Sequence, residues 1–353
     1  MDATSRFASS PDTSRVFIVI LNWNGIADTL ECLASVKKLD YPSCRTIVVD
    51  NGSDDGSPER LKTECPDIAL IEHRANLGFT GGANAGIRYA LAHGADYVWL
   101  LNNDSIVEPN SLSALVAAAK SDEAMGLVSP LIYDLSDERR LLFGGNWVFA
   151  DLAHLRFAAG PKPAAGSPDA LAGRPLLLWG TALLISSAVI RRVGYLDDRY
   201  FAYHEDLDYS LRALAAGFRT AVEPAATVYH KADNFSRLKS PFKMYLFSRN
   251  LLLFCFTHLS GLARYTYLPK YVAWAIRQAA DLRDINNDAA ADACLDGAWN
   301  ALLGRYGSPA SAIPMPGPLR HSLSRHPYFW TWLLRGEFRK VLRAVVGRLM
   351  RFT

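Results

Sequence analysis

Cysteine is scarce in this sequence of 353 residues, and its cysteines do not form a recognisable pattern. The five residues have no CxxC pair among them, and their number is odd. This spacing argues against a disulfide framework and against a zinc site, and it is typical of a reducing cytosol. The positions are Cys32, Cys44, Cys65, Cys255 and Cys294.

Long apolar runs are missing as well. A membrane-spanning helix needs roughly 18 to 20 apolar residues without charge, whereas the longest candidate, Leu251 to Ala263, is shorter and contains His258. Residues 1–14 lack the apolar core of a signal peptide and predict a flexible leader. We therefore expect a cytoplasmic protein.

Two phosphate-binding motifs are also absent. No GxGxxG follows the first predicted strand, which disfavours a dinucleotide-dependent dehydrogenase. The sequence has no GxxxxGK[ST] either, which disfavours P-loop chemistry.

The apolar residues that are present follow an α/β pattern. Half of the chain is apolar, enough for a sizeable core. Strand-like runs alternate with helical patterns, which predicts a parallel sheet wound with right-handed crossovers. The four runs are Val16–Leu21, Arg45–Val49, Ile68–Glu72 and Tyr97–Leu101.

A polar segment follows each of these strands, and parallel strands bring such segments to one edge of the sheet. Asp50 could accept a hydrogen bond from a nucleobase, and the glycines of Gly78–Gly86 would let the backbone approach a ribose or diphosphate. Asp104, in Asn102-Asn-Asp104, offers hard oxygen ligands that suit Mg²⁺ or Mn²⁺. Taken alone, Asp50 and Asp104 also fit turn or helix-cap positions.

A second group of acidic residues, His204-Glu-Asp-Leu-Asp208, begins an amphipathic helix. Its spacing pairs Asp208 with Arg212 and predicts a buried stripe of Leu207, Leu211 and Leu214. Asp206 belongs neither to this ion pair nor to the leucine stripe. It could serve as a general base, or could be a favourable charge at a helix N-terminus. His230 ends a later strand. It could be a packed or surface residue, or it could be a metal ligand.

In this order the motifs resemble family 2 glycosyltransferases of the GT-A fold, and most closely the rhamnosyltransferase-like bacterial branch that builds cell-surface polysaccharides. The match covers about residues 15–250. It rests on Asn22-Trp-Asn-Gly25, Asp50-Asn-Gly-Ser53, Asn76-Leu-Gly-Phe-Thr-Gly-Gly-Ala-Asn84, Leu100-Leu-Asn-Asn-Asp104, Trp179-Gly-Thr181, Tyr200-Phe-Ala-Tyr-His-Glu-Asp-Leu-Asp208 and Val228-Tyr-His230. The resemblance implies a Rossmann-like, mostly parallel central sheet flanked by helices, with a helical C-terminal extension.

The resemblance also implies site residues. Asp206 would be the acceptor base, with Glu205 as its rival, and Asp104 and His230 would hold Mg²⁺ or Mn²⁺. The family's DxD-type motif here reads Asn102-Asn103-Asp104, so an amide replaces its first carboxylate. The implied nucleotide-sugar-binding residues are Asn22, Asn24, Asp50, Asn51, Asn76, Gly78, Asn84, Asn102, Asn103, Trp179 and Gly180.

The implied activity is a metal-dependent, inverting transfer of a sugar from a nucleotide-sugar donor to a hydroxyl of a glycan or lipid-linked acceptor. Rhamnose from dTDP-rhamnose is the donor that this branch implies. The alternative is a non-catalytic nucleotide-sugar binding scaffold, which the amide at Asn102 favours. A nucleotidyltransferase is disfavoured, because Asn22-Trp-Asn-Gly25 is neither glycine-rich nor basic.

We expect a leader at 1–14, a catalytic domain at 15–235 and a helical basic region at 236–353. The catalytic domain would divide into a nucleotide-binding half, 15–105, and an acceptor half, 106–235, whose Ala-, Pro- and Gly-rich loop 151–175 could act as a lid.

Charge is divided unevenly between the two ends of the chain. Residues 1–234 hold 21 Lys and Arg against 29 Asp and Glu, a net charge of −8, and residues 235–353 hold 17 against 6, a net charge of +11. The predicted final helix, Phe329–Phe352, has a basic and an apolar side with Trp330 and Trp332 at its start. It fits a peripheral contact of 327–353 with the inner face of the cytoplasmic membrane, or a helix packed on the catalytic domain. No nucleic-acid module accompanies the charge.

Overall fold

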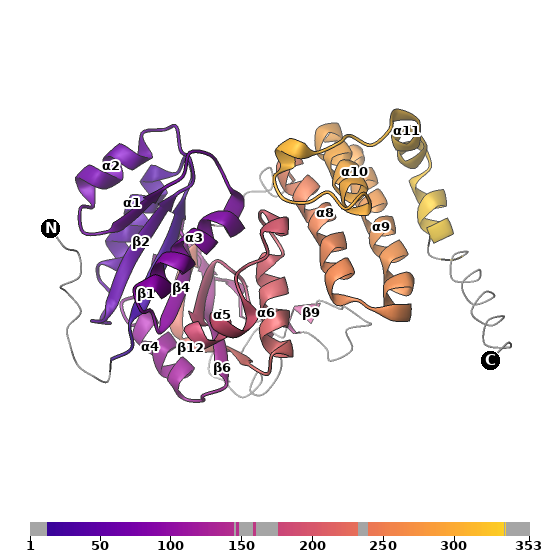
Figure 1. Cartoon of the computed structure of the whole chain (residues 1–353). Coiled ribbons are helices and arrows are strands. Elements are labelled where there is room, and N and C mark those ends of the chain that lie inside the picture. Colours follow the sequence, from indigo (N-terminus) through magenta and orange to yellow (C-terminus); the bar gives the residue numbers. More distant parts are fainter. Residues whose placement is uncertain are drawn as a thin grey trace. The chain divides into compact units, whose positions relative to one another are not determined.

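A mixed sheet of nine strands forms the centre of the N-terminal part of the chain in the computed structural model (Figure 1). The structure describes residues 13–144, 146–147, 158–159, 176–231, 239–334 and 336. They fall into two compact units. The first holds the described residues of 1–150, 155–201 and 205–232, and the second those of 202–204 and 233–353. Almost all of the predicted leader and of loop 151–175 lies outside the described residues.

The first unit alternates strands and helices along the chain. Its elements are β1 (Val16–Asn22), α1 (Ile26–Val36), β2 (Cys44–Asp50), α2 (Ser57–Glu64), β3 (Ala69–Glu72), α3 (Gly78–Ala92), β4 (Tyr97–Asn102), β5 (Ser105–Val107), α4 (Ser111–Lys120), β6 (Met125–Asp134), β7 (Asp137–Phe143), β8 (Asn146–Trp147), β9 (Ala158–Ala159), β10 (Leu176–Leu177), β11 (Ala182–Ser186), α5 (Ser187–Val193), the 3₁₀ helix η3 (Asp198–Tyr200), α6 (Glu205–Ala215) and β12 (Arg219–His230).

The four predicted strands form the parallel half of the sheet. They lie in the order β3-β2-β1-β4, and their carboxyl ends share one edge. Beyond β4 the directions are mixed: β11 runs antiparallel to both β4 and β6, β12 is parallel to β6, and β5 is antiparallel to β12. Strands β8, β9 and β10 form a separate small sheet.

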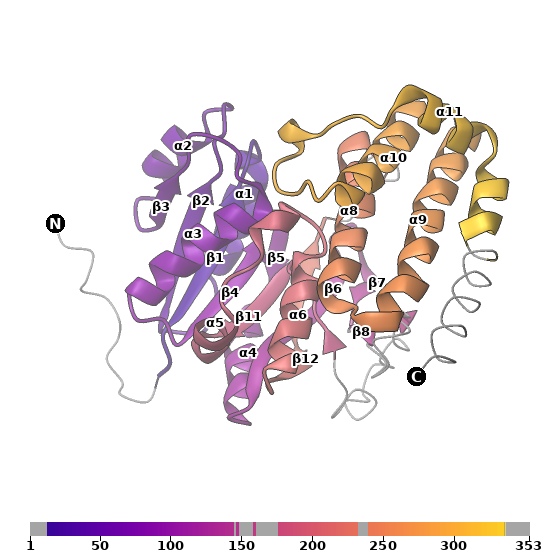
Figure 2. The same ribbon diagram turned by 45° about the vertical axis from the view of Figure 1, so that its right-hand side comes forward.

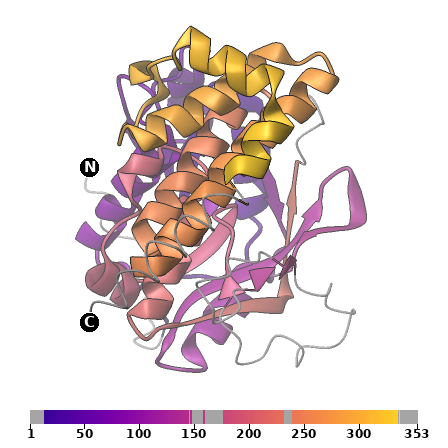
Figure 3. The ribbon, with the colours of Figure 1, turned by 90° about the vertical axis from the view of Figure 1, so that its right-hand side faces the viewer.

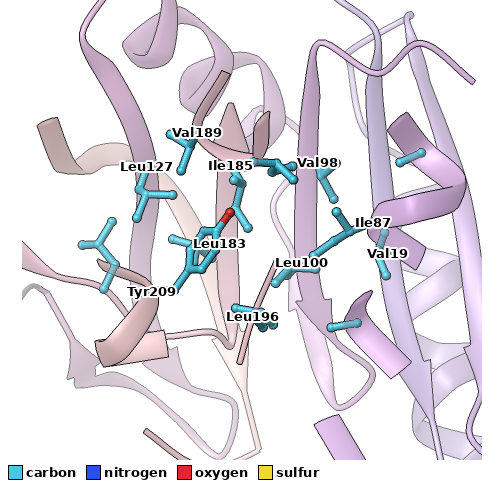
Figure 4. Close-up of a cluster of buried hydrophobic side chains, with 14 of the residues drawn as sticks. Val19, Ile87, Val98, Leu100, Leu127, Leu183, Ile185, Val189, Leu196 and Tyr209 are labelled. Carbon is cyan, nitrogen blue, oxygen red and sulfur yellow. The ribbon is translucent and has the colours of Figure 1, made fainter. Parts of the chain in front are cut away.

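Helices cover both faces of the main sheet because its strands are apolar on both sides. On one face Phe17 and Val19 of β1 share a buried cluster with side chains of α3, α5 and α6. Figure 4 shows this cluster, with Ile87 of α3 and Tyr209 of α6 beside strand residues such as Leu100 and Leu183. On the other face α1, α2 and α4 pack over Ile18, Ile20 and Trp99. The result is a three-layer α/β unit.

The sequence predicts that the glycine-rich stretch after β3 lies close to a ligand, and the structure differs from this prediction. Helix α3 already begins at Gly78, so Gly81, Gly82 and Gly86 are helical. A Cβ on Gly82 would lie 2.7 Å from Leu21 Cδ2, and one on Gly86 would lie 2.3 Å from Val19 Cγ1. The expectation that this whole stretch approaches a ribose or diphosphate is therefore wrong. These two glycines let α3 pack closely on β1.

The second unit is helical, as the sequence predicts for the C-terminal extension. Helices α8 (Pro241–His258), α9 (Gly261–Asp284), α10 (Asp288–Leu302) and α11 (Gly317–Arg325) contribute to one buried cluster, with the 3₁₀ helix η4 (Pro309–Ser311) between α10 and α11. Figures 2 and 3 show α8, α9 and α10 side by side. Residues 327–334 add a further helical segment. Among the residues that the structure describes, no helix is long and apolar enough to cross a membrane.

Candidate active site

The loops after β1 and β2 are joined by a buried polar cluster. Asn22 and Asp50 are 0% and 1% exposed, and the Asn22 amide donates to Asp50 Oδ1 at 2.8 Å and to Ser53 Oγ at 3.1 Å. Asp50 Oδ2 accepts from the Ser53 backbone N–H at 3.0 Å. Asn24, next along the loop, is exposed with a left-handed φ of 51° and caps the Asp54 N–H at 2.9 Å. These bonds set the shape of the sheet edge.

Asn51 ties the β2 loop to the turn before α3. Its amide donates to Gly78 O at 2.9 Å and to Asn76 Oδ1 at 3.1 Å, and its Oδ1 accepts from the Leu77 N–H at 3.1 Å. Asn76 Oδ1 also accepts from the Gly78 N–H at 2.8 Å. Gly78 has a φ of +76°. The structure thus brings the predicted residues of these three loops together.

The polar end of β4 faces His230. The pairing of β12 with β5 sets His230 opposite Ser105, so that its Nε2 lies 3.0 Å from Asp104 Oδ1 and 3.3 Å from Asn102 Nδ2. Asp104 Oδ1 is buried and accepts no hydrogen bond of good geometry. An anionic oxygen left in this way is costly unless a cation or donor satisfies it. Asp104 and His230 therefore offer a divalent cation one carboxylate and one imidazole nitrogen, and Asn102 lies beside them.

This donor set is sparse. Within the described ranges, no three His, Cys, Asp or Glu side chains gather closely enough to hold a metal ion. Further oxygen ligands would have to come from a side-chain amide or from the bound substrate itself.

Thr29 is a link that the sequence did not reveal. It is fully buried in α1, donates to Asn22 Oδ1 at 2.8 Å, and accepts from the Asn103 amide at 3.0 Å. It therefore joins the loop after β1 to the loop after β4. Lys231 was also missed: its backbone N–H donates to Asp104 O at 3.1 Å, and its ammonium pairs with Asp28 of α1. The sequence could have pointed to Thr29 through its position, because it is a polar residue on the buried side of α1.

The acidic pair lies at the start of α6, and its two carboxyl groups have different surroundings. Asp206 is partly exposed and accepts two backbone hydrogen bonds, from Gly180 at 2.9 Å and from Leu207 at 2.8 Å. Glu205 is 6% exposed, and its Oε2 is buried without a partner. Gly180 follows Trp179, whose ring stacks on Phe143 at 4.9 Å. The Trp179-Gly180 segment thus reaches the acidic pair, a contact that the sequence did not reveal.

The pKa values of both carboxyl groups are raised. Burial raises the pKa of Glu205 well above its usual range, and the charges of Asp206 and Asp208 raise it further. Burial also raises the pKa of Asp206, but the backbone N–H groups of Gly180 and Leu207 act in the opposite direction. Asp206 is therefore the member of the pair with specific donors that stabilise its charged form.

The rest of α6 confirms one prediction and corrects another. Asp208 is fully buried and accepts from Arg212 Nε at 2.7 Å, as the spacing predicts. The buried stripe of three leucines is wrong in part, because Leu207 and Leu214 are only partly buried. Asp208, Tyr209 and Ala213 occupy the buried side with Leu211.

Asn84 does not join the cluster at the loop ends. It is 1% exposed in α3, and its amide donates to Leu196 O and to Asp198 Oδ1. Both side-chain hydrogens are used, which leaves no donor for a ligand. The geometry favours a packing role for Asn84 over nucleotide-sugar binding.

Two family models match the chain: Glycosyl transferase family 2 over residues 17–152 and Glycosyl transferase family group 2 over residues 97–249. The chain is 31% identical over 225 residues to the N-acetylglucosaminyl-diphospho-decaprenol L-rhamnosyltransferase of Mycobacterium tuberculosis, across 58% of this chain and 72% of that one. The chain belongs to glycosyl transferase family 2.

A second relative and two solved structures are also similar to this family 2 glycosyltransferase. Galactofuranosyltransferase GlfT1 of Mycobacterium tuberculosis is 29% identical over 225 residues, covering 60% of this chain and 69% of the relative. A mannosyltransferase, PcManGT, from Pyrobaculum calidifontis superposes with a TM-score of 0.50 at 16% identity, over 97% of this chain and 89% of its own. TarS of S. aureus, residues 1–349, gives 0.52 at 13% identity, over 92% and 91%. These structures confirm the predicted GT-A fold.

Proposed function

We propose that this glycosyltransferase transfers a sugar with inversion from a nucleotide-sugar donor to an acceptor hydroxyl, and that Asp206 is its general base. The observation that carries the proposal is the unequal pair at the start of α6. Asp206 is partly exposed with two backbone donors, whereas Glu205 is buried with an unpartnered oxygen. Neighbouring carboxyl groups in different surroundings divide into a charged and a neutral member.

The reaction is a single displacement. The acceptor hydroxyl gives its proton to Asp206, and its oxygen forms a bond to the anomeric carbon. The bond from that carbon to the diphosphate oxygen breaks on the opposite face, and the nucleoside diphosphate leaves with the electron pair. Holding the two reactants in line supplies much of the rate enhancement. A carboxylate whose pKa is raised is a stronger base than an ordinary aspartate.

The donor would lie over the loops that end β1, β2, β3 and β4. In this arrangement the buried Asn22, Asp50 and Asn51 hold the loops in shape. The side chains with exposed surface contact the nucleotide sugar, and these are Asn24, Asn76, Asn102 and Asn103. Gly78 lets the backbone turn sharply beside them.

A divalent cation, Mg²⁺ or Mn²⁺, would be held by Asp104 and His230. PcManGT, which has the same fold, is described in complex with GDP-Man and Mn2+. Such an ion neutralises charge on the departing diphosphate. Asp104 Oδ1, buried and 3.0 Å from His230 Nε2, supports this placement.

The relatives suggest the donor and the acceptor. The name of the rhamnosyltransferase indicates a decaprenyl-diphosphate-linked N-acetylglucosamine acceptor and a rhamnosyl group. We infer that this chain transfers rhamnose from dTDP-rhamnose to a glycan or lipid-linked acceptor in polysaccharide synthesis. A thermal-shift screen across nucleotide sugars, with Mn²⁺, Mg²⁺ or EDTA, tests this donor. The largest rise in unfolding temperature should come from dTDP-rhamnose with a cation; a larger rise with a galactofuranosyl donor would overturn the assignment.

Replacing Glu205 with glutamine tests which carboxyl group is the base. Glutamine has the shape of a neutral glutamic acid, so E205Q should keep kcat within a few-fold of the wild type, with the same acid limb in its pH profile. Because the folded-state pKa of Glu205 is raised, its ionisation destabilises the native state as pH rises through the carboxyl range. E205Q should therefore unfold at a higher temperature than the wild type at neutral pH, and the difference should vanish at low pH. A large loss of kcat would make Glu205 the base.

We further propose that the C-terminal region contacts a membrane surface. The predicted contact segment, 327–353, lies mostly outside the described residues. Helix 327–334 presents Tyr328, Phe329 and Trp332 with 72%, 55% and 58% of their surface exposed. Exposed aromatic side chains in a region, 235–353, whose net charge is +11 are typical of an interfacial contact with anionic lipid.

Co-sedimentation of the full chain with anionic vesicles tests this contact. The double variant F329S/W332S should bind several-fold less than the wild type. Tyr265, an exposed aromatic of α9 at 59%, provides the matched control, and Y265S should bind normally. Equal binding of all three proteins would remove the membrane proposal.

A further inference from the structure

The backbone just before the acidic pair adopts conformations that bulky residues rarely take. Phe201, Tyr203 and His204 have φ angles of 65°, 69° and 70°. Side chains with a Cβ disfavour this region, so such residues persist where the surrounding structure holds them. The segment that leads into Glu205 and Asp206 therefore needs support from its neighbours.

Helix α3 supplies that support within the first unit. The Thr80 N–H donates to Phe201 O at 3.1 Å. One turn further on, the Asn84 amide donates to Leu196 O at 2.9 Å and to Asp198 Oδ1 at 2.8 Å, and its Oδ1 accepts from the Leu196 N–H at 3.0 Å. Three hydrogen bonds from one side chain fix the stretch 196–198, and a fourth bond from the helix fixes residue 201.

Asn84 is well placed to keep this stretch rigid. It is 1% exposed, so its bonds do not compete with water. Its partners come from a segment more than a hundred positions away in the sequence, with separations of 112 and 114 residues. A buried asparagine with all of its bonds made to one loop specifies the position of that loop.

The same helix also begins at the donor loops. Gly78, its first residue, is bonded through its carbonyl to Asn51 and through its N–H to Asn76. A Cβ on Gly78 would lie 2.4 Å from Phe201 O. One rigid element thus contacts both the turn assigned to the donor and the segment that precedes the acidic pair.

We propose that Asn84 is a positioning residue that places Asp206 relative to the bound donor. This rests on the proposed function, since it assumes that Asp206 is the base. Asn84 contacts neither substrate nor the reacting atoms. It acts by holding residues 196–201, from which the chain continues through three residues into α6.

Steady-state kinetics of N84A test the proposal. A displacement of the base by about 1 Å costs on the order of 100-fold in rate, so kcat should fall by about 10- to 100-fold while the donor dissociation constant stays unchanged. Ser187 provides a matched control in the same unit: it is 2% exposed, and its hydroxyl donates to Ala95 O at 2.6 Å. S187A should be destabilised and keep its kcat.

Milder variants guard against a loss of folding in N84A. D198A removes one of the acceptors of Asn84 and should lower kcat less than N84A, whereas D198N keeps an acceptor oxygen and should restore kcat. The double variant N84A/D206N should be no slower than D206N, because a residue that acts only through the base has no effect once the base is removed.

The outcomes separate this proposal from the function on which it rests. If D206N kept the wild-type kcat, the base assignment would fail. If D206N were inactive and N84A had normal kcat, or raised only the donor dissociation constant, Asn84 would not position the base. A further loss in the double variant would likewise overturn the proposal.

Discussion

Replacing Asp206 with asparagine is expected to lower kcat by about 10²- to 10⁴-fold, the usual contribution of a positioned general base. The variant removes the only basic group of the side chain and keeps its size. One of its two backbone bonds is also lost, because an amide has a single acceptor oxygen where the carboxylate accepts from Gly180 and Leu207. Some loss of stability is therefore expected along with the loss of rate.

The effect on catalysis can be separated from the effect on stability. The donor dissociation constant of D206N, measured by calorimetry, should match that of the wild type, since the role proposed for Asp206 concerns the acceptor. In the wild type the acid limb of kcat/KM should lie above the range of an ordinary aspartate, because the pKa of Asp206 is raised and its charged form is the active one. E205Q is the matched control. Transfer by D206N at the wild-type rate would refute the base assignment.

Replacing Gly78 with alanine is expected to abolish most activity and to destabilise the first unit. The φ of +76° alone costs about 1–2 kcal/mol for a residue with a Cβ. In addition, that Cβ would lie 2.4 Å from Phe201 O and 2.6 Å from its ring. A backbone oxygen cannot move as easily as the end of a flexible side chain, so the turn of Asn51 and Asn76 or the segment at Phe201 must shift.

Gly217 separates the two causes. Its φ is +92°, and a Cβ there would meet nothing within 4 Å. G217A should therefore lose a similar amount of stability from the left-handed backbone and keep its activity, whereas G78A should show both a weaker donor affinity and a lower kcat. Chemical denaturation and steady-state kinetics of the two variants provide the comparison. Equal activity of G78A and G217A would contradict a coupling between donor turn and acidic pair.

The parallel half of the fold could be predicted from sequence because each strand there is a short, mostly apolar run between helical patterns. The direction of β11 could not. A strand buried on both faces has the same composition whichever way it runs, and its partners β4 and β6 are separated from it by long stretches of chain. Mixed pairing beyond β4 is set by tertiary contacts that single-sequence patterns do not contain.

The glycines and the asparagine of α3 show a second limit of prediction from the sequence. Glycines after a strand suggest a loop that approaches a ligand, but Gly82 and Gly86 instead make room for Leu21 and Val19. The motif ending in Asn84 carries the family resemblance correctly, yet the use of that side chain depends on Leu196 and Asp198, which are remote in sequence. In α6 the leucine spacing similarly missed that Asp208, Tyr209 and Ala213 occupy the buried side with Leu211.

The amide at Asn102 fits two functions for this family member. One is a catalyst with a sparse cation site, and the other is a scaffold that binds nucleotide sugars. Asp104 with His230 and the unequal Glu205–Asp206 pair favour the catalyst. A scaffold would have no need of a carboxylate held by two backbone donors.

The most direct measurement is the anomeric configuration of the product. The full chain would be incubated with dTDP-rhamnose, Mn²⁺ and a polyprenyl-diphosphate-linked N-acetylglucosamine, and the product examined by NMR. A single displacement predicts a glycosidic bond of inverted configuration and one nucleoside diphosphate released per bond formed, at a rate about 10²- to 10⁴-fold lower in D206N. Tight donor binding without product, or a product of retained configuration, would contradict the account.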